Sequence, residues 1–349
     1  MAFFECCERS AGPQTNDASV RHLCDLTVSV IIPTRNRPEE LSTLLTCLSE
    51  QTVRPREIIV IDDSDDSKTE QLVRENAGEL RIKRITLSYA RNENEKSLTI
   101  ARNLGVSLAK FEIIMFLDDD VELYNNYLEE VLKVYARNPA AVGVQGYFKT
   151  GRNNSLSNAM HKVFYLSQSV QNKWQILPSG QEVFPIPLTK TIDCPRLSGA
   201  NHSYRKQVFK LLSFDETLKG YGFGEDKDFS YRVSKKYPKG LYCTPNAKLI
   251  HKESTKARLP RKSQLYMESV NDLYFFYKNI PQTLSNKAIY AWSRIGLLIA
   301  MFTGLLLKSK TKAYLPQIAY LLSSYLWAMK HSREIKTGNL SFADEVLRN

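Results

Sequence analysis

The chain has 349 residues, of which 43% are hydrophobic; this composition excludes general disorder and allows one large α/β domain with an appendage. The net charge of +11 is concentrated in two stretches: residues 248–262 contribute +5 and residues 285–336 contribute +7. A nucleic-acid binder would spread its basic surface over the fold, so we exclude nucleic acid as a partner. The distribution instead indicates phosphate groups at the first stretch and an anionic membrane surface at the second.

The N-terminal residues are polar and aperiodic, and residues 1–26 are predicted to form a loose leader. They contain no apolar run of signal-peptide length, so we expect a cytoplasmic protein. The six cysteines form no C-x-x-C pair and have no metal-ligand spacing, which predicts reduced and mostly buried thiols.

From Val28 onward, apolar strands alternate with amphipathic helices. The runs VSVIIP, EIIVID and EIIMFL are continuous and apolar, as expected of strands buried on both faces of a sheet. Pro38 is predicted to open the first helix, with two glutamates at its N-terminus. This order predicts a doubly wound, mostly parallel sheet, whose ligands bind beyond the carboxyl ends of the strands. The strands are expected at 28–33, 57–62, 82–88, 112–117 and 142–147, and the helices at 38–48, 68–76, 98–110 and 124–138.

The second half of the chain is less regular and then becomes helical. A catalytic domain is expected over 27–262 and a helical region over 263–349. The further elements expected are a strand at 247–250 and helices at 156–170, 205–212, 225–236, 265–278, 288–307 and 313–331.

Three carboxylates, Asp118, Asp119 and Asp120, directly follow the strand EIIMFL. Clustered carboxylates repel one another unless a cation neutralises them, and oxygen ligands suit Mg²⁺ or Mn²⁺. The alternative is a solvated acidic turn. His251, just after the short strand AKLI, would complete a metal site as a neutral imidazole, or it is a hydrogen-bonded structural histidine.

Two further acidic motifs stand at predicted element ends. Asp62-Asp63-Ser64 follows the strand EIIVID and would accept hydrogen bonds from a base and a ribose, or cap a helix. Glu225 and Asp226 begin a helix, where an ionised carboxylate suits a general base or only compensates the helix dipole. The segment LSGAN before them, with Gly199, Ala200 and Asn201, allows close approach of a ligand or forms a tight turn, and Gly224 would let backbone approach a sugar.

Taken in order, seven segments of the chain resemble glycosyltransferase family 2, the inverting enzymes of GT-A fold. They are VSVIIPTRNR, EIIVIDDSDD, LTIARNLGV, EIIMFLDDDVEL, LSGANHSYR, GFGEDKDFSYRV and AKLIHK. The resemblance implies an α/β fold of GT-A type and a nucleotide-sugar donor. It covers residues 28–252 and rests on agreement in order and spacing.

The resemblance also assigns roles to individual residues. It implies that Asp226 is the catalytic base beside Glu225, and that Asp118 and Asp120 are the outer carboxylates of the metal-binding motif, with Asp120 as direct ligand. His251 matches a histidine that joins the metal site in some members. The residues matched to the donor site are Pro33, Thr34, Arg35, Asp63, Arg102, Asn103, Asp118 and Asp119. A processive Q-x-x-R-W motif is absent from the sequence, which favours single-sugar transfer.

The expected function is therefore inverting, metal-dependent transfer from a nucleotide-diphosphate sugar to a hydroxyl of a glycan or of a lipid-linked or polyprenyl-diphosphate-linked acceptor. Cell-surface polysaccharide or glycolipid synthesis is the expected setting. A sugar nucleotidylyltransferase is the alternative enzyme, although PTRNRPEE after the first strand lacks the glycine-rich phosphate loop it would need. A non-catalytic scaffold that binds glycan or membrane is the other alternative.

The C-terminal helices are apolar but interrupted. Residues 295–307 are uncharged over only ~20 Å of helix, and a span needs about 20 apolar residues. Lys308, Lys310 and Lys312 stand between the helices, and a spanning hairpin would put them outside, against the positive-inside tendency. We therefore expect helices in the cytoplasmic leaflet of the membrane, a peripheral location. The alternatives are a pair packed on the catalytic domain or on a partner in a homodimer, and a hairpin that spans the membrane.

Overall fold

The computed structural model describes residues 23–93, 95–147, 155–254, 256, 259–307 and 311–340. A 3-10 helix, Leu23–Asp25, begins the described part. Most of the leader predicted for residues 1–26 lies outside the described residues.

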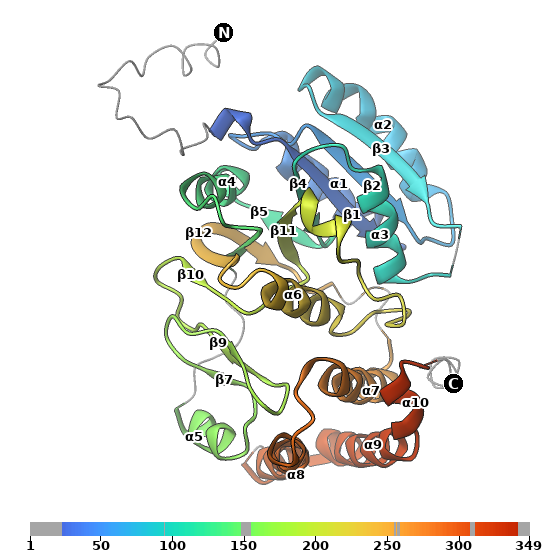
Figure 1. The fold of residues 1–349 in the computed structure, drawn as a ribbon. Coiled ribbons are helices and arrows are strands. Elements are labelled where there is room, and N and C mark those ends of the chain that lie inside the picture. The colour runs from blue at the N-terminus through green and yellow to red at the C-terminus, as the bar shows by residue number, and fades with distance from the viewer. Residues whose placement is uncertain are drawn as a thin grey trace.

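A nine-stranded sheet forms the centre of the upper part of the molecule (Figure 1). Its strands run β10-β12-β6-β11-β4-β1-β2-β3, and β5 pairs with β12. Strands β4, β1, β2 and β3 are mutually parallel, whereas β11 runs antiparallel to both β4 and β6. The predicted mostly parallel, mixed sheet is confirmed. The strands are β1 (Val28–Thr34), β2 (Glu57–Asp62), β3 (Thr86–Arg91), β4 (Ile113–Leu117), β5 (Val121–Leu123), β6 (Gly143–Tyr147), β10 (Ile192–Asp193), β11 (Asn201–Arg205) and β12 (Leu241–His251).

Helices cover both faces of the sheet, which explains the continuous apolar runs. In β1, Val28, Val30 and Ile32 join one core cluster and Ile31 joins another, as the period of two in a strand requires. The first cluster packs against α1 (Pro38–Ser49), α2 (Lys68–Ile82) and α4 (Tyr127–Arg137), and the second against α3 (Leu98–Leu108) and α6 (Glu225–Lys236).

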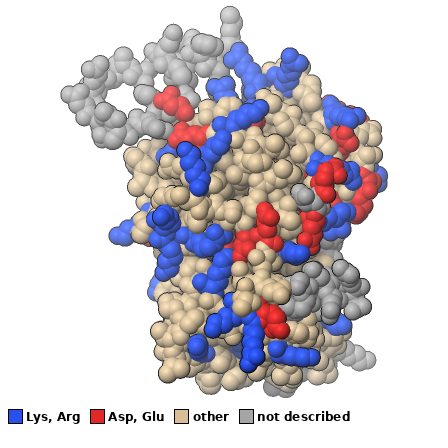
Figure 2. Space-filling model, turned by 45° about the vertical axis from the view of Figure 1, so that its right-hand side comes forward, with Lys and Arg blue, Asp and Glu red and all other residues tan. Residues whose placement is uncertain are grey.

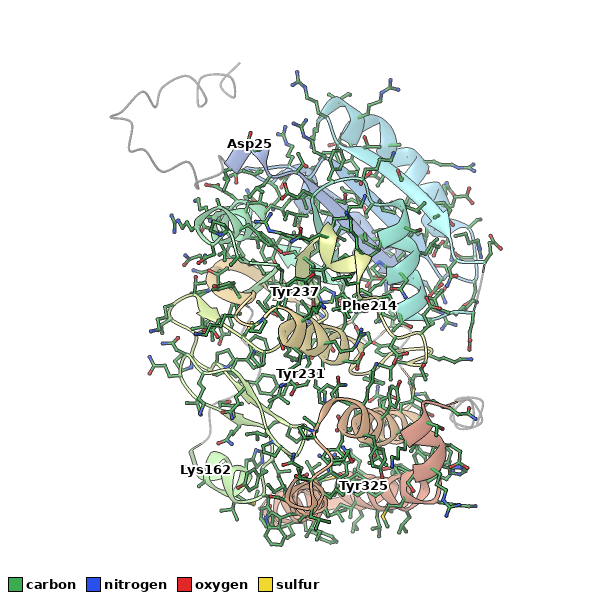
Figure 3. All side chains as sticks on the ribbon, viewed as in Figure 1. Asp25, Lys162, Phe214, Tyr231, Tyr237 and Tyr325 are labelled. Carbon is green, nitrogen blue, oxygen red and sulfur yellow. The ribbon has the colours of Figure 1, made fainter. Side chains whose placement is uncertain are left out.

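The C-terminal helices form a separate layer below α6 (Figure 1). In this layer α7 packs on α6 and α9, and α8 packs on α9. Tyr231 of α6 contacts the Phe275 ring of α7 edge-on, and Figure 3 shows Tyr231 between the sheet and these helices. The helices are α7 (Arg261–Asn279), α8 (Leu284–Leu307), α9 (Thr311–Lys330) and α10 (Ser332–Thr337). Among the residues described, none of the helices has both the length and the apolarity to cross a membrane.

A small outer sheet follows α5 (Ser155–Val163) and consists of β7 (Gln168–Ser169), β8 (Gln175–Ile176) and β9 (Glu182–Phe184). Two predicted elements are wrong here. The helix expected over 156–170 ends at Val163, and the helix expected from residue 205 is preceded by strand β11 and reduced to a 3-10 turn, Lys206–Lys210.

Candidate active site

A cavity of about 280 Å³ lies at the carboxyl ends of β1, β2 and β4. Because β1 pairs in parallel with both β2 and β4, the residues that follow these three strands meet at one edge of the sheet. The structure brings together eight of the site residues predicted from sequence. The cavity lining includes Pro33, Thr34, Arg35, Asp63, Asp118, Asp119, Asp120 and His251.

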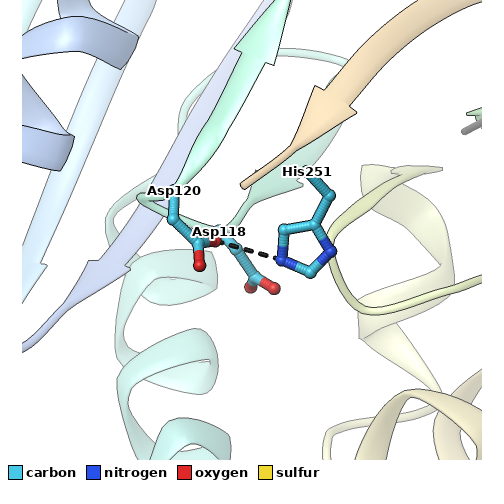
Figure 4. Close-up of side chains that lie close together, drawn as sticks. All are labelled: Asp118, Asp120 and His251. Carbon is cyan, nitrogen blue, oxygen red and sulfur yellow. Dashed lines mark hydrogen bonds and ion pairs between the residues drawn. The ribbon is translucent and has the colours of Figure 1, made fainter. Parts of the chain in front are cut away.

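Asp118, Asp120 and His251 form a cluster in which one ligand atom of each residue lies within 4.8 Å of the others (Figure 4). His251 reaches Asp120 because β12 pairs antiparallel with β5, and this register sets His251 opposite Val121. The His251 Nε2 atom lies 3.1 Å from Oδ1 of Asp120. Two carboxylates and an imidazole are a suitable donor set for Mn²⁺, and also for Mg²⁺ if water completes the shell.

Asp119, the middle carboxylate of the motif, holds the end of β4 against the end of β1. Its Oδ2 accepts a 2.7 Å hydrogen bond from the Thr34 hydroxyl, and its Oδ1 accepts a 3.0 Å bond from Arg37. Burial raises the pKa of the Asp119 carboxyl to about 7, although Arg37 and Thr34 oppose this rise. Asp119 therefore links two strand ends, whereas Asp118 and Asp120 belong to the cluster with His251.

The two aspartates after β2 have different surroundings. Asp62 is fully buried, and its carboxylate accepts hydrogen bonds from the Ser64 amide and the Tyr89 hydroxyl, so its contacts are structural. Asp63 lines the cavity and accepts a 2.7 Å bond from the Asn92 side chain. Burial raises the pKa of the Asp63 carboxyl, and the hydrogen bond from Asn92 partly offsets this rise. Of the pair, Asp63 is the one a ligand in the cavity can reach.

Arg102 lies beneath the cavity, with only 1% of its surface exposed. Its guanidinium contacts the carboxylate of Glu225 and lies 3.3 Å from Asp118. Burial raises the pKa of the Glu225 carboxyl, and the charge of Arg102 opposes the rise. Asn103, also matched to the donor site, instead donates to the Phe214 carbonyl and to Glu216. Neither Arg102 nor Asn103 is in the cavity lining.

Asp226 is the second residue of α6, which follows Gly224 in a left-handed conformation with φ of 81°. Its Oδ2 accepts hydrogen bonds from Arg196 at 2.7 Å and from the Gly199 amide at 2.8 Å. Its Oδ1 accepts one bond, from the Lys227 amide at 2.7 Å. Burial raises the pKa of Asp226, but Arg196 and the other groups around the carboxylate, among them Arg102 and the Lys227 amide, together outweigh burial, so the pKa lies below its usual value and the carboxylate is ionised.

The predicted LSGAN segment is only partly at the site. A Cβ on Gly199 would lie 3.4 Å from both Asp226 Cβ and Glu225 Oε1, so this glycine allows the close approach of the loop to α6. Ala200 and Asn201 are buried in the sheet, where Tyr127 donates to the Asn201 side chain at 3.1 Å. No residue of this segment is in the cavity lining.

Several functional candidates escaped sequence reasoning. Arg196 forms an ion pair with Glu182 of the outer sheet at 2.6 Å and so joins that sheet to Asp226. Neither residue belongs to a periodic pattern or a motif that marks it in the sequence. Arg37 stands within PTRNR, the segment that supplied three predicted residues, and was within reach of prediction. The other cavity residues that the sequence did not predict are Lys96, Ser97, Leu98 and Tyr221.

The amino-acid sequence is similar to those of several curated proteins. Chondroitin synthase from Escherichia coli is 29% identical over 239 residues, 62% of this chain and 33% of that protein. The poly(ribitol-phosphate) beta-N-acetylglucosaminyltransferase TarP from Staphylococcus aureus is 28% identical over 137 residues, 38% of this chain and 40% of TarP. The chain spans about a third of the length of the curated relatives it matches.

Two solved structures resemble the whole described fold. The mannosyltransferase PcManGT from Pyrobaculum calidifontis, in complex with GDP-Man and Mn²⁺, covers 94% of this chain and 93% of its own, with TM-score 0.54 and 16% identity. TarS from S. aureus, in complex with UDP-GlcNAc, covers 93% and 92%, with TM-score 0.52 and 18% identity. Residues 29–212, more than half of the sequence, match the model of glycosyl transferase family 2. The fold and this match confirm the resemblance seen in the sequence: the chain belongs to glycosyl transferase family 2.

Proposed function

We propose that the protein transfers a sugar from a nucleotide-diphosphate donor to a hydroxyl acceptor, with a divalent cation and with inversion at the anomeric carbon. The observation that carries the proposal is the cluster of Asp118, Asp120 and His251 at the edge of the 280 Å³ cavity. Mn²⁺ or Mg²⁺ held there would supply Lewis-acid stabilisation of the departing diphosphate. The structure of PcManGT with GDP-Man and Mn²⁺ supports the same chemistry by analogy of fold.

The donor would lie in the cavity with its base toward Asp63 and its diphosphate toward the metal cluster. Asp63 has a second carboxylate oxygen that can accept a hydrogen bond from the base. Arg37 and Lys96, two cations of the cavity lining, are suited to the phosphate oxygens. Arg102, which lies outside the cavity lining, would hold the Asp118 carboxylate in position.

Asp226 is proposed to accept the proton of the attacking hydroxyl. A general base must be ionised, and the pairing with Arg196 keeps Asp226 in that state. A carboxylate oxygen has two acceptor positions, and within the described part of the chain Oδ1 uses one, for the Lys227 amide. One base without a protein nucleophile leads to a single displacement and hence to inversion.

The acceptor is proposed to be a saccharide or a lipid-linked or polyprenyl-diphosphate-linked glycan, in the synthesis of cell-surface polysaccharide or glycolipid. The names of two relatives, chondroitin synthase and the poly(ribitol-phosphate) transferase TarP, support a polymeric acceptor. A cytoplasmic location is part of the proposal, and it agrees with Cys47, Cys194 and Cys243 being free thiols.

The proposal is tested by analysis of the nucleotide product. The protein is incubated with Mn²⁺, a mixture of saccharide acceptors and a panel of UDP-, GDP-, dTDP- and CMP-sugars. Release of a nucleoside diphosphate that stops with EDTA supports glycosyl transfer. Formation of nucleotide sugar and pyrophosphate from a nucleoside triphosphate and a sugar phosphate would instead identify a nucleotidylyltransferase, and no turnover of any donor would favour a scaffold.

A further inference from the structure

Two neighbouring helices of the C-terminal layer present large apolar side chains to solvent. On α8, Trp292, Ile295, Ile299 and Phe302 recur with helical spacing and are 37–49% exposed. On α9, Leu315, Leu322, Leu326 and Met329 do the same and are 47–67% exposed. We call these eight side chains the apolar face. Monomeric soluble proteins rarely leave so many large apolar side chains together in water, so we expect a partner to cover the apolar face.

The helices α8 and α9, which carry the apolar face, lie at the end of the molecule opposite the nine-stranded sheet (Figure 1). It continues onto α5, because the Trp292 indole donates to the Val163 carbonyl at 3.0 Å and stacks near Phe164. Val163 is itself 61% exposed. A surface built from three helices is broader than the single groove that one peptide helix would fill.

Basic residues accompany the apolar face. Lys287 is exposed on α8 five residues before Trp292, Lys330 follows Met329 directly, and Arg333 and Lys336 are exposed on α10. Residues 285–336 hold eight basic residues and one acid, Glu334. Figure 2 shows that Lys and Arg side chains outnumber Asp and Glu toward the lower end of the molecule. Among the eight, Arg294 is committed to an ion pair with Asp272 at 3.3 Å.

We infer that the apolar face docks on the surface of a bilayer that contains anionic lipid. Apolar side chains on one side of a helix, bounded by Lys and Arg, are the chemistry of helices that lie in the headgroup region. The helices would lie on the membrane, since no described helix is long and apolar enough to span it.

A second copy of the chain fits this surface less well. A twofold interface would bring each apolar face, with the exposed Lys287, Lys330, Arg333 and Lys336 near it, against the same surface of the partner. Like charges juxtaposed across an interface are unfavourable, whereas anionic headgroups neutralise them.

Docking would also set the position of the candidate active site relative to the membrane surface. Lys227 at the start of α6 pairs with Asp272 of α7 at 2.9 Å, and Asp272 in turn pairs with Arg294 of α8. This chain of ion pairs ties the helix that begins with Glu225 and Asp226 to the helix that carries half of the apolar face.

The test is co-sedimentation of the full-length protein with vesicles of phosphatidylcholine alone or with about 30% phosphatidylglycerol. We expect binding to the anionic vesicles at least about tenfold tighter than to the neutral ones, and severalfold weaker at about 0.5 M salt than at about 0.1 M. The triple variant L322S/L326S/M329S should lose at least about tenfold in binding, because it removes three apolar side chains from the contact.

The matched control is Ile82→Ser, which removes an apolar side chain that is 84% exposed on α2, at the other end of the molecule. It should bind vesicles like the wild type. Circular dichroism melts of all variants show whether they are folded. Equal sedimentation of the triple variant and the wild type would overturn the inference. So would a lipid-free wild-type dimer by light scattering that the triple variant converts to monomer, since the face would then be a subunit interface.

Discussion

Replacing Asp226 with asparagine removes one negative charge while preserving the shape of the side chain. The Gly199 amide donates to Oδ2 and the Lys227 amide to Oδ1, so asparagine, with one carbonyl oxygen, leaves one of these amides without its acceptor. Arg196 loses a 2.7 Å ion pair but keeps Glu182 at 2.6 Å, so the buried guanidinium still has a counter-charge. The substitution therefore tests charge and basicity without leaving an uncompensated cation.

These contacts determine how much stability and turnover the substitution should remove. Removing one partner of a buried ion pair costs about 3–5 kcal/mol when the other charge is left alone. Because Glu182 still neutralises Arg196, we expect a smaller loss of about 1–3 kcal/mol in the free energy of unfolding. Loss of a general base lowers turnover by ~10²–10⁴.

The stability difference should depend on pH in a defined direction. Burial raises the pKa of Asp226, but Arg196 and the other groups around the carboxylate together outweigh burial, so the folded-state pKa lies below the reference value of 3.8. A depressed pKa contributes stability that is present above the unfolded-state pKa and is lost as pH falls through the folded-state pKa. The gap in unfolding free energy between wild type and Asp226→Asn should be constant near neutral pH and should narrow below about pH 4.

The assay combines turnover, nucleotide affinity and urea unfolding. Asp228→Asn is the matched control, since it removes a carboxylate from the same helix that is 1% exposed and paired with Arg232 and Lys278. Both variants should lose stability, but only Asp226→Asn should lose turnover. Glu225→Gln should reduce turnover less, since Glu225 contacts Arg102 and its proposed role is orientation. Near-normal turnover in Asp226→Asn would refute the base assignment, and a large loss in Glu225→Gln alone would reverse the two roles.

Three further outcomes test the metal site and the core. Asp120→Asn and excess EDTA should each reduce transfer by at least about 100-fold, because each removes the cation from the diphosphate. An unchanged melting temperature would show that the Asp120→Asn variant is folded. Full activity in the chelator would exclude a role for the metal. His251→Gln should weaken Mn²⁺ binding by about 10–100-fold in a titration without donor, and an unchanged affinity would remove His251 from the ligand set. Gly105→Ala places a Cβ 2.4 Å from Ile31 Cγ2 and should cost about 1–3 kcal/mol in urea unfolding. The Cβ that Gly78→Ala adds has no atom within 4 Å, so this variant should stabilise α2 by about 0.5–1 kcal/mol. Equal effects of the two substitutions on the free energy of unfolding would contradict the packing of α3 on β1.

The sequence predicted the parallel half of the fold well because burial on both faces produces continuous apolar runs. Strand β2 (Glu57–Asp62) and helix α6 (Glu225–Lys236) have the bounds that the patterns predicted. Strand β11 was missed because NHSYR looks polar. Its His202 and Ser203 are fully buried between β4 and β6, so the neighbouring strands, and not the residue types, make it a central strand.

The candidate site was predictable where residues directly follow a strand. Asp63, Asp118 and Asp120 reach the cavity because parallel strands end at one edge. Contacts between distant segments could not be predicted in the same way. The pairing of Asp226 with Arg196 depends on the outer sheet, and the position of Arg102 beneath the cavity depends on α3 packing against α6 and the sheet. The roles carried over from the family remain predictions for all of the site residues, Arg102 and Asn103 included.

The central claim is that a divalent cation at Asp118, Asp120 and His251 binds the diphosphate of a nucleotide donor. Its most direct test is a thermal-shift panel of UDP, GDP, dTDP and CMP, each with and without Mn²⁺, on the wild type and on Asp120→Asn. The account predicts that at least one nucleoside diphosphate raises the melting temperature of the wild type only when Mn²⁺ is present, and that Asp120→Asn loses this shift. The same shift in EDTA, or in the folded Asp120→Asn variant, would contradict it.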